Sequence, residues 1–147
     1  MATFIPLISS GTSGPLGVLH LPRLWLKASL ELRGKLDSRY PGAGQGYDQM
    51  TIDALGLKRD VVLAFIKEKR PNYPQFEAWV KAQPGVKLDS DSVEKHNAAV
   101  RGFMHDDDTR KRVLSSNGLP DDATAVKDAI HLNDLDSWQE FYADELK

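Results

Sequence analysis

The sequence predicts an all-α fold, a single compact domain of several helices with an extended N-terminal arm and a C-terminal helix. Apolar residues recur at spacings of three and four along most of the 147 residues, as they do on the buried face of an amphipathic helix. Short runs rich in proline and glycine separate these segments. No segment alternates apolar and polar residues in the manner of a half-buried strand. Helices packed around one hydrophobic core are therefore expected.

We divide this single domain, residues 1–147, into an arm (1–19), a core (20–104) and a C-terminal extension (105–147). The arm contains the turn-forming run from Ser9 to Pro15 and is not expected to form a regular element. Pro22 suits the first turn of the first core helix, where its missing N–H has no partner to lose. Asn133 or Asp134 is expected to cap the last helix. Apolar periodicity places the helices at about 21–36, 48–55, 61–66, 76–80, 90–104, 106–114 and 134–146.

Composition and charge exclude several classes of protein. The formal net charge of −2 argues against a nucleic-acid-binding protein, which normally carries a basic excess. No apolar run is long enough to span a membrane, and the first residues lack the basic start of a signal peptide. Without cysteine the chain has no disulfide, thiolate metal site or thiol nucleophile. A cytoplasmic location is expected, and a homo-oligomer is possible.

A row of three basic residues and one glycine on the first core helix is the main candidate site. His20, Arg23, Lys27 and Gly34 follow one another at spacings that place them along one helical stripe. Apolar arcs flank the stripe on both sides, and one of them contains Trp25, so part of the row is expected to face protein. Arg23 and Lys27 would then bind a carboxylate or phosphate, with Trp25 beside them.

Each of these residues also has a simpler explanation. Arg23 and Lys27 could form salt bridges on a solvated helix face, with Glu31 or with the acidic run 106–108 as partners. If Lys27 is desolvated, its lowered pKa would also permit a Schiff base with a carbonyl substrate. The sequence leaves these alternatives open.

Proton transfer in such a site would fall to histidine or tyrosine. His20 lies at the start of the cationic row, and His96 shares the apolar face of a distant helix with Asn97. Nearby cations would lower the pKa of a histidine and keep it neutral, which suits a general base. Tyr47 follows the glycine loop 42–46 and could supply a phenol. Alternatively, His96 is a hydrogen-bonded core residue and Tyr47 is buried with its hydroxyl paired.

Several of these residues resemble a known family. Leu16-Gly17, the Leu21-Pro22-Arg23 run with Lys27-Ala28, and Gly34 are similar to the signature of a bacterial helical family, domain of unknown function 5069. The resemblance extends over roughly residues 16–103. The further matching positions are Tyr47-Asp48, Leu55-Gly56-Leu57, Trp79-Val80 and Asn97. The resemblance implies a helical fold and brings no activity with it.

No cofactor or metal site is expected. The glycine loop 42–46 is not followed by Lys-Ser/Thr, so it is not a nucleotide-binding loop. His105 and the aspartates of 106–108 are consecutive in the sequence. Consecutive side chains point in different directions around a helix, so they rarely bind one metal ion. No serine lies in a Gly-x-Ser-x-Gly motif.

Two functions remain compatible with the sequence. The first is a small cofactor-independent enzyme that acts on an anionic organic small molecule by proton transfer, of the lyase, isomerase or hydration type. The second is a non-catalytic helical module that binds an anionic ligand or the acidic surface of a partner.

Overall fold

The computed structural model describes residues 2–147 and confirms the predicted all-α fold. Within these residues the only β-type pairings are two isolated bridges, Phe4 with Leu36 and Met104 with Asp128. The helices are α1 (Leu21–Leu32), α2 (Tyr47–Ala54), α3 (Arg59–Lys69), α4 (Tyr73–Lys81), α5 (Ser90–Gly102), α6 (Asp107–Ser116) and α7 (Ala129–Phe141), followed by one π-helical segment, η1 (Tyr142–Leu146).

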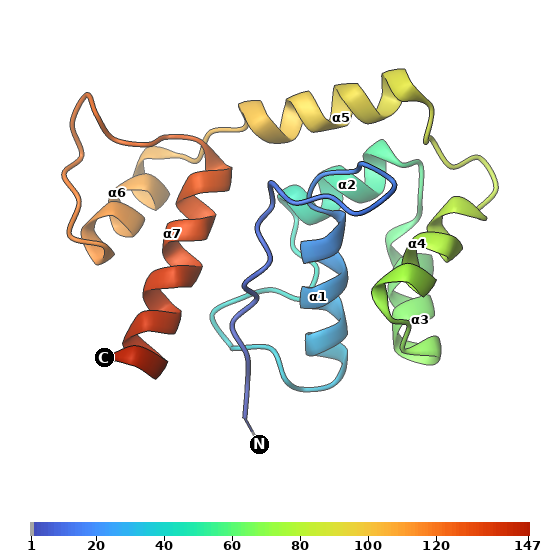
Figure 1. The fold of residues 1–147 in the computed structure, drawn as a ribbon, viewed down its shortest axis with the longest axis horizontal. Helices are drawn as coiled ribbons and strands as arrows, with labels where there is room; N and C mark the ends of the chain where they lie inside the picture. Colours follow the sequence, from blue (N-terminus) through green and yellow to red (C-terminus); the bar gives the residue numbers. More distant parts are fainter. Residues whose placement is uncertain (1) are drawn as a thin grey trace.

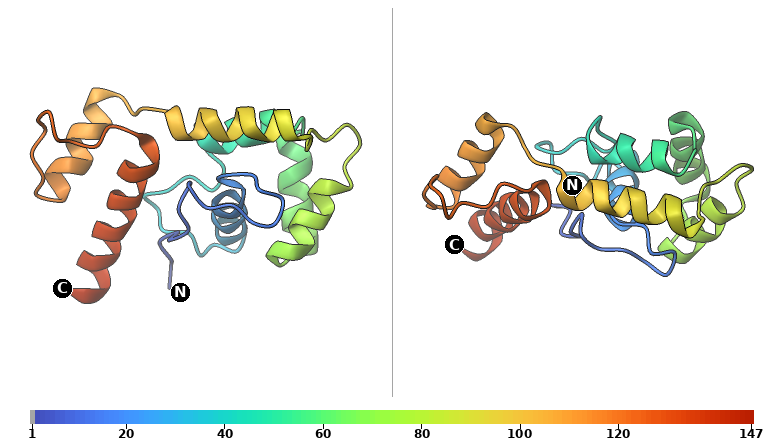
Figure 2. Two further views of the ribbon diagram at one scale, coloured as in Figure 1. Left: turned by 45° about the horizontal axis from the view of Figure 1, so that its top comes forward. Right: turned by 90° about the horizontal axis from the view of Figure 1, so that it is seen from above.

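Helix α1 occupies the centre of the molecule (Figure 1). Helices α3 and α4 lie on one side of it, α6 and α7 lie on the other, and α5 runs across one end. Figure 2 shows the same division from two further directions, with α5 connecting the two sides. No helix among residues 2–147 has the length and apolar character that crossing a bilayer requires.

The main hydrophobic core lies between α1, α2, α3 and α4. Phe76 and Val80 of α4 are completely buried, as is Val62 of α3. They pack in one cluster with Leu21 and Leu24 of α1. A separate small cluster joins α6 to α7. Burying a side chain of this size stabilises the fold by about 1.5–3 kcal/mol, so α1 is fixed mainly by its apolar face.

Local signals explain where several helices begin and end. Asn72 and Gln75 form a reciprocal capping box at the start of α4. Helix α1 ends earlier than its apolar pattern suggests, because Gly34 takes a φ of 67° and the N–H of Lys35 bonds to Leu30. Gly34 therefore belongs to the turn after α1 and not to the helical stripe.

The predicted start of the last helix is wrong by about one turn. Asp128, not Asn133 or Asp134, caps α7 by accepting the backbone N–H of His131. Asp134 lies inside the helix and accepts a hydrogen bond from Ser9 at 3.0 Å. The prediction left Ala129 and Leu132 outside the helix, but both are fully buried and belong to it.

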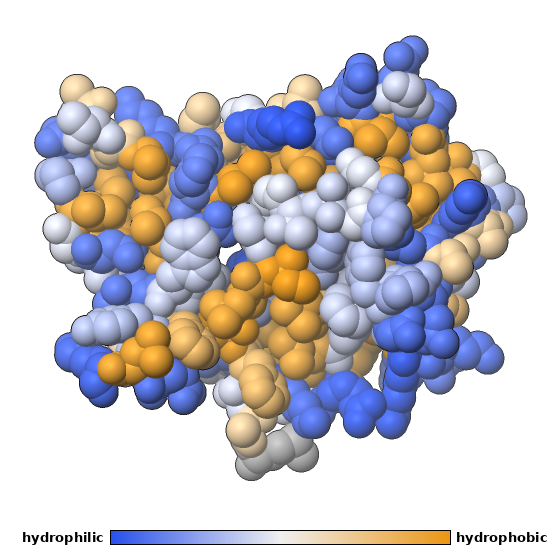
Figure 3. Space-filling view, in the orientation of Figure 1, coloured by the Kyte–Doolittle hydropathy of each residue, from blue (hydrophilic) through white to orange (hydrophobic). Residues whose placement is uncertain are grey.

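The arm runs alongside α1 without regular structure. Phe4 bonds through its backbone to Lys35 and Asp37, which ties the arm to the turn after α1. Figure 3 shows apolar side chains gathered on this face of the molecule, over the arm and α1. They surround a shallow groove lined by Phe4, Ile5, Leu7, Ile8, Leu26 and Leu30.

Candidate functional site

Three polar side chains of the predicted row are buried at one end of α1. His20, Arg23 and Lys27 are 2%, 5% and 7% exposed, respectively. His20 directly precedes the helix with a left-handed backbone (φ 73°), while the spacing of four residues puts Arg23 and Lys27 on one face. Buried cations need partners, so the surroundings of these groups define the site.

The partner that the sequence did not reveal is Asp48. Asp48 does not cap α2, because Gly46 occupies the cap position and no side chain caps the helix there. Asp48 instead lies in the first turn of α2, and its side chain, 1% exposed, faces α1. A spacing of 21 residues from Lys27 gives no local signal for this pairing, because the glycine loop between them sets the direction of α2.

Asp48 accepts hydrogen bonds from three directions. Lys27 Nζ lies 2.7 Å from Oδ2, and His20 Nε2 lies 2.6 Å from Oδ1. The backbone N–H of Gly44 donates to Oδ2 at 2.7 Å. The other ring nitrogen of His20, Nδ1, is 2.9 Å from Ser10 Oγ. We call Ser10, His20, Asp48 and Lys27 the buried network.

Burial and charge set the protonation states in the buried network. Burial is the main cause that lowers the pKa of His20, against the opposing effect of Asp48. Burial likewise lowers the pKa of Lys27. Burial alone would raise the pKa of Asp48, but the hydrogen bonds from His20 and Lys27 and the Lys27 charge hold it well below its usual range. The network therefore contains a neutral imidazole between a hydroxyl and a carboxylate near neutral pH.

A pocket of about 280 Å³ opens beside this network. Three cationic side chains and two carboxylates lie in its wall, and it is bounded by α1, the glycine loop, α2, the segment after α5, and α7. The lining residues that carry charge or hydrogen-bonding groups are His20, Arg23, Lys27, Arg39, Tyr40, Gln45, Tyr47, Asp48, His105, Asn133 and Asp136.

Arg23 divides its donors between the arm and the pocket. Its Nη1 donates to the carbonyls of Pro6 at 2.7 Å and Ile8 at 2.9 Å. Its Nη2 makes only a long contact, 3.5 Å, with Ser137 Oγ, and the guanidinium lies 5.9 Å from the centre of the Tyr40 ring. One side of this guanidinium thus holds the arm in place, and the other side faces the pocket.

Tyr47 lines the pocket with its ring, but its hydroxyl is already paired. The phenol donates to the carbonyl of Val100 at 2.6 Å, and burial raises its pKa. Its ring packs 5.2 Å from that of His20. Tyr47 therefore forms part of the pocket wall and packs against His20. The hydroxyl proton of Tyr47 is already donated to the backbone of α5.

The glycine loop is held by several hydrogen bonds. The backbone N–H of Gly42 donates to Glu31 at 2.8 Å, and that of Gly44 donates to Asp48. Arg59 of α3 donates to the carbonyls of Ala43 and Gly44. The backbone N–H of Gly44 is thus bound to the protein's own carboxylate and does not face a ligand.

His96 and Asn97 lie outside the pocket lining. Asn97 accepts the N–H of Leu19 at 3.0 Å and donates to the carbonyl of Gly17 at 2.8 Å. His96 Nε2 lies 3.0 Å from the carbonyl of Leu19, and burial lowers its pKa. Both side chains fasten the segment before α1 to α5, which places His20 at the edge of the pocket.

Trp25 faces the opposite side of α1. Its indole N–H donates to the carbonyl of Pro71 at 3.0 Å, and its ring packs edge-on against Tyr73 at 5.5 Å. It is therefore part of the packing between α1 and the loop before α4. Of the seven candidate residues from the sequence, the structure brings His20, Arg23, Lys27 and Tyr47 to the pocket.

His105 is a pocket residue that the sequence had not assigned to the site. Its Nε2 lies 2.8 Å from Oδ1 of Asn133, which can only accept, so Nε2 carries the proton. In the neutral ring Nδ1 is then an unprotonated acceptor. The signal in the sequence was weak, because His105 follows α5 and Asn133 belongs to α7, whose start was misplaced.

The arrangement can hold an anion and receive a proton. Lys27 has three N–H donors and one partner, Asp48, while Arg23 keeps donors toward the pocket. Within residues 2–147 no group of three or more histidine, aspartate or glutamate side chains is placed to hold a metal ion.

No protein-family model matches the chain, and comparisons with curated proteins and with solved structures find no match. The resemblance to domain of unknown function 5069 stays a prediction.

Proposed function

We propose that the protein is a small enzyme that transfers a proton on an anionic organic small molecule, without a cofactor, in a lyase, isomerase or hydration reaction. The observation that carries this proposal is the Lys27 ammonium, which is bonded to buried Asp48 and forms part of the wall of a pocket. A preorganised cation in a partly dry site binds a carboxylate or phosphate more strongly than a solvated lysine does.

The substrate anion lies against Lys27 and Arg23 in this proposal. Asp48 stays ionised and fixes the direction of the Lys27 ammonium, so two of its N–H groups remain for the substrate. His20 acts as a positioning residue, because both of its ring nitrogens are occupied and its bond to Asp48 holds that carboxylate in place.

His105 takes the proton. Among the histidines that line the pocket, His105 alone has a ring nitrogen without a hydrogen-bond partner in the described residues. Its bond to Asn133 fixes the tautomer in which Nδ1 accepts. Removal of a proton beside a carboxylate builds negative charge, and the Arg23 and Lys27 cations stabilise that charge.

The second candidate is a non-catalytic module that binds an anionic ligand or an acidic partner surface. The environment of His20 favours this candidate. Both of its ring nitrogens are hydrogen-bonded and it is only 2% exposed, so it has a structural role and no free nitrogen for a substrate proton. In this case the pocket binds an anion through Lys27 and Arg23, and no proton moves.

Two experiments separate these functions. Thermal-shift screening against small carboxylates and phosphates detects binding, which raises the melting temperature by mass action. Incubation of the same compounds in D₂O, followed by proton NMR, detects removal of a carbon-bound proton. An enzyme gives deuterium incorporation that His105→Asn abolishes while binding persists, with His131→Asn, at an exposed histidine, as the control. Binding without incorporation supports the module, and absence of any binding overturns both.

A further inference from the structure

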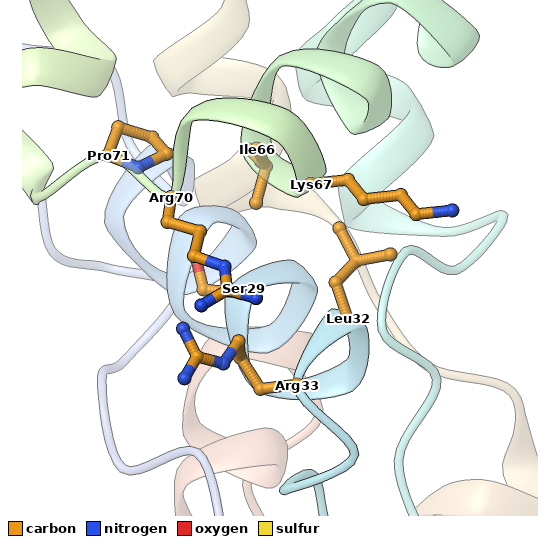
Figure 4. A pocket seen from close by; sticks show the side chains of 7 residues that line it. All are labelled: Ser29, Leu32, Arg33, Ile66, Lys67, Arg70 and Pro71. Carbon is orange, nitrogen blue, oxygen red and sulfur yellow. The ribbon is translucent and has the colours of Figure 1, made fainter.

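A second pocket, of about 350 Å³, lies between the C-terminal ends of α1 and α3, on residues that the first pocket does not use. Its lining combines cationic and apolar side chains (Figure 4). The lining residues are Ser29, Leu32, Arg33, Ile66, Lys67, Arg70 and Pro71.

Two arginines converge in this pocket. The guanidinium groups of Arg33 and Arg70 turn toward one another, while the Lys67 side chain runs away from them past Leu32 (Figure 4). No acidic residue lines the pocket. Among residues 2–147, none of these three cations has a carboxylate within ion-pair distance. Like charges that face each other without a counter-charge repel, and an anion between them removes the repulsion.

Ser29 provides an independent observation. Its Oγ is buried beside the two arginines and has no hydrogen-bond partner in the described part of the chain. A buried hydroxyl is nearly always paired, so an unpaired one in a pocket wall indicates a missing partner. The hydroxyl is closed to solvent, so it can donate to the anion only once the neighbouring side chains move aside on binding.

The positions of the arginines at helix ends explain part of the arrangement. Arg33 and Arg70 are the residues that follow the last turns of α1 and α3, where the helix dipole favours a positive charge. That effect accounts for a cation at each end. It does not account for two guanidinium groups that face each other, nor for the unpaired hydroxyl of Ser29.

We propose that this pocket binds a phosphate or sulfate monoester of a small molecule. One guanidinium already satisfies both oxygens of a carboxylate, whereas a tetrahedral oxyanion has enough acceptor sites for two guanidinium groups and a hydroxyl. The volume exceeds that of the anion, and Leu32, Ile66 and Pro71 provide apolar contact for the organic part of the ester.

NMR titration of the arginine side-chain Nε–Hε signals tests this site with phenyl phosphate, inorganic phosphate and benzoate as probes. Phenyl phosphate should shift the Arg33 and Arg70 signals and bind more tightly than inorganic phosphate. Arg33→Gln should weaken its binding at least ten-fold, and Ser29→Ala should weaken it several-fold. Arg101→Gln, which removes an exposed cation on α5, should leave binding unchanged.

Other outcomes overturn the proposal. Equal binding of benzoate and phenyl phosphate contradicts the assignment to a tetrahedral anion. Absence of shifts at Arg33 and Arg70 shows that these arginines serve only the helix ends. An equal loss of affinity in Arg101→Gln shows that the anion is attracted by overall charge and not by this pocket. The Lys27→Met/Asp48→Asn double variant must retain binding at this site, so failure here is distinguishable from failure of the function proposed for the first pocket.

Discussion

Lys27 and Asp48 form a buried ion pair with 2.7 Å between Nζ and Oδ2, and the two side chains are 8% and 1% exposed. The pair joins α1 to α2 at the wall of the first pocket. A buried ion pair contributes little net stability, because desolvation of both charges offsets their attraction. Its position beside a pocket is one basis for the anion binding proposed above.

Removing one member of this pair should be costly. Asp48→Asn leaves the Lys27 charge buried without a counter-charge, and we expect a loss of about 3–5 kcal/mol in the free energy of unfolding. Urea denaturation measures this loss. Asp53→Asn, at an exposed position of the same helix, is the matched control and should change stability by less than about 0.5 kcal/mol.

Removing both charges should restore part of the stability. In Lys27→Met/Asp48→Asn no charge is left unpaired, so the double variant should be more stable than the sum of the two single changes predicts. Additive losses would show that the two groups do not interact as the geometry states.

The contribution of His20 to stability should rise with pH below the ordinary pKa of histidine, about 6.5. Burial lowers the pKa of His20 in the folded state, so the unfolded chain binds a proton there that the folded chain does not. Stability then increases as pH rises toward that value, by at most about 1.4 kcal/mol per pH unit for each such group. Burial also lowers the pKa of His96, so its contribution to stability changes with pH in the same direction.

Urea denaturation between pH 5.5 and 7 measures this slope. His20→Asn should remove part of it, and asparagine tolerates the left-handed backbone at this position. Direct NMR titration should place the His20 midpoint below about 6.5. A midpoint above that value would refute the neutral imidazole of the buried network.

Arg23 should hold the arm to the body of the protein. Arg23→Gln removes the charge-assisted hydrogen bonds to the carbonyls of Pro6 and Ile8, each of which contributes about 1.5–3 kcal/mol. Hydrogen exchange should then increase in residues 4–10, and Arg101→Gln should leave it unchanged. Unaltered exchange in Arg23→Gln would mean that the arm is held by its other contacts.

Asp128 should stabilise the N-terminus of α7 as its cap. Asp128→Ala removes the cap at the helix start and should lower the unfolding free energy by about 0.5–2 kcal/mol. Asp122→Ala, in the exposed loop before it, is the comparison and should have a smaller effect. Equal effects would contradict a helix that begins at Ala129.

The sequence predicted the fold better than it predicted the site. Periodicity located the core faces of the helices, because burial of Val62, Phe76 and Val80 repeats with the helical period. The pairing of Lys27 with Asp48 could not be predicted, because it depends on how the glycine loop turns between α1 and α2.

The C-terminal part of the chain shows a second limit of the sequence. His105 and Asn133 reach the pocket only because α7 folds back against α5, a tertiary arrangement with no local signature. His96 and Asn97 shared a helix face as predicted, yet their partners are backbone groups of residues 17–19. Residue types alone do not distinguish a side chain that binds a ligand from one that binds the main chain.

The most direct test of the central claim is observation of the Lys27 ammonium group by ¹⁵N–¹H NMR while small carboxylates and inorganic phosphate are added. A buried ammonium bonded to Asp48 exchanges slowly enough to be seen. We predict that at least one of these anions shifts the Lys27 signal, and that Arg23→Gln, which keeps the Lys27 ammonium but removes the second cation, weakens this shift. A Lys27 signal that none of these anions moves would contradict an anion site at this pocket.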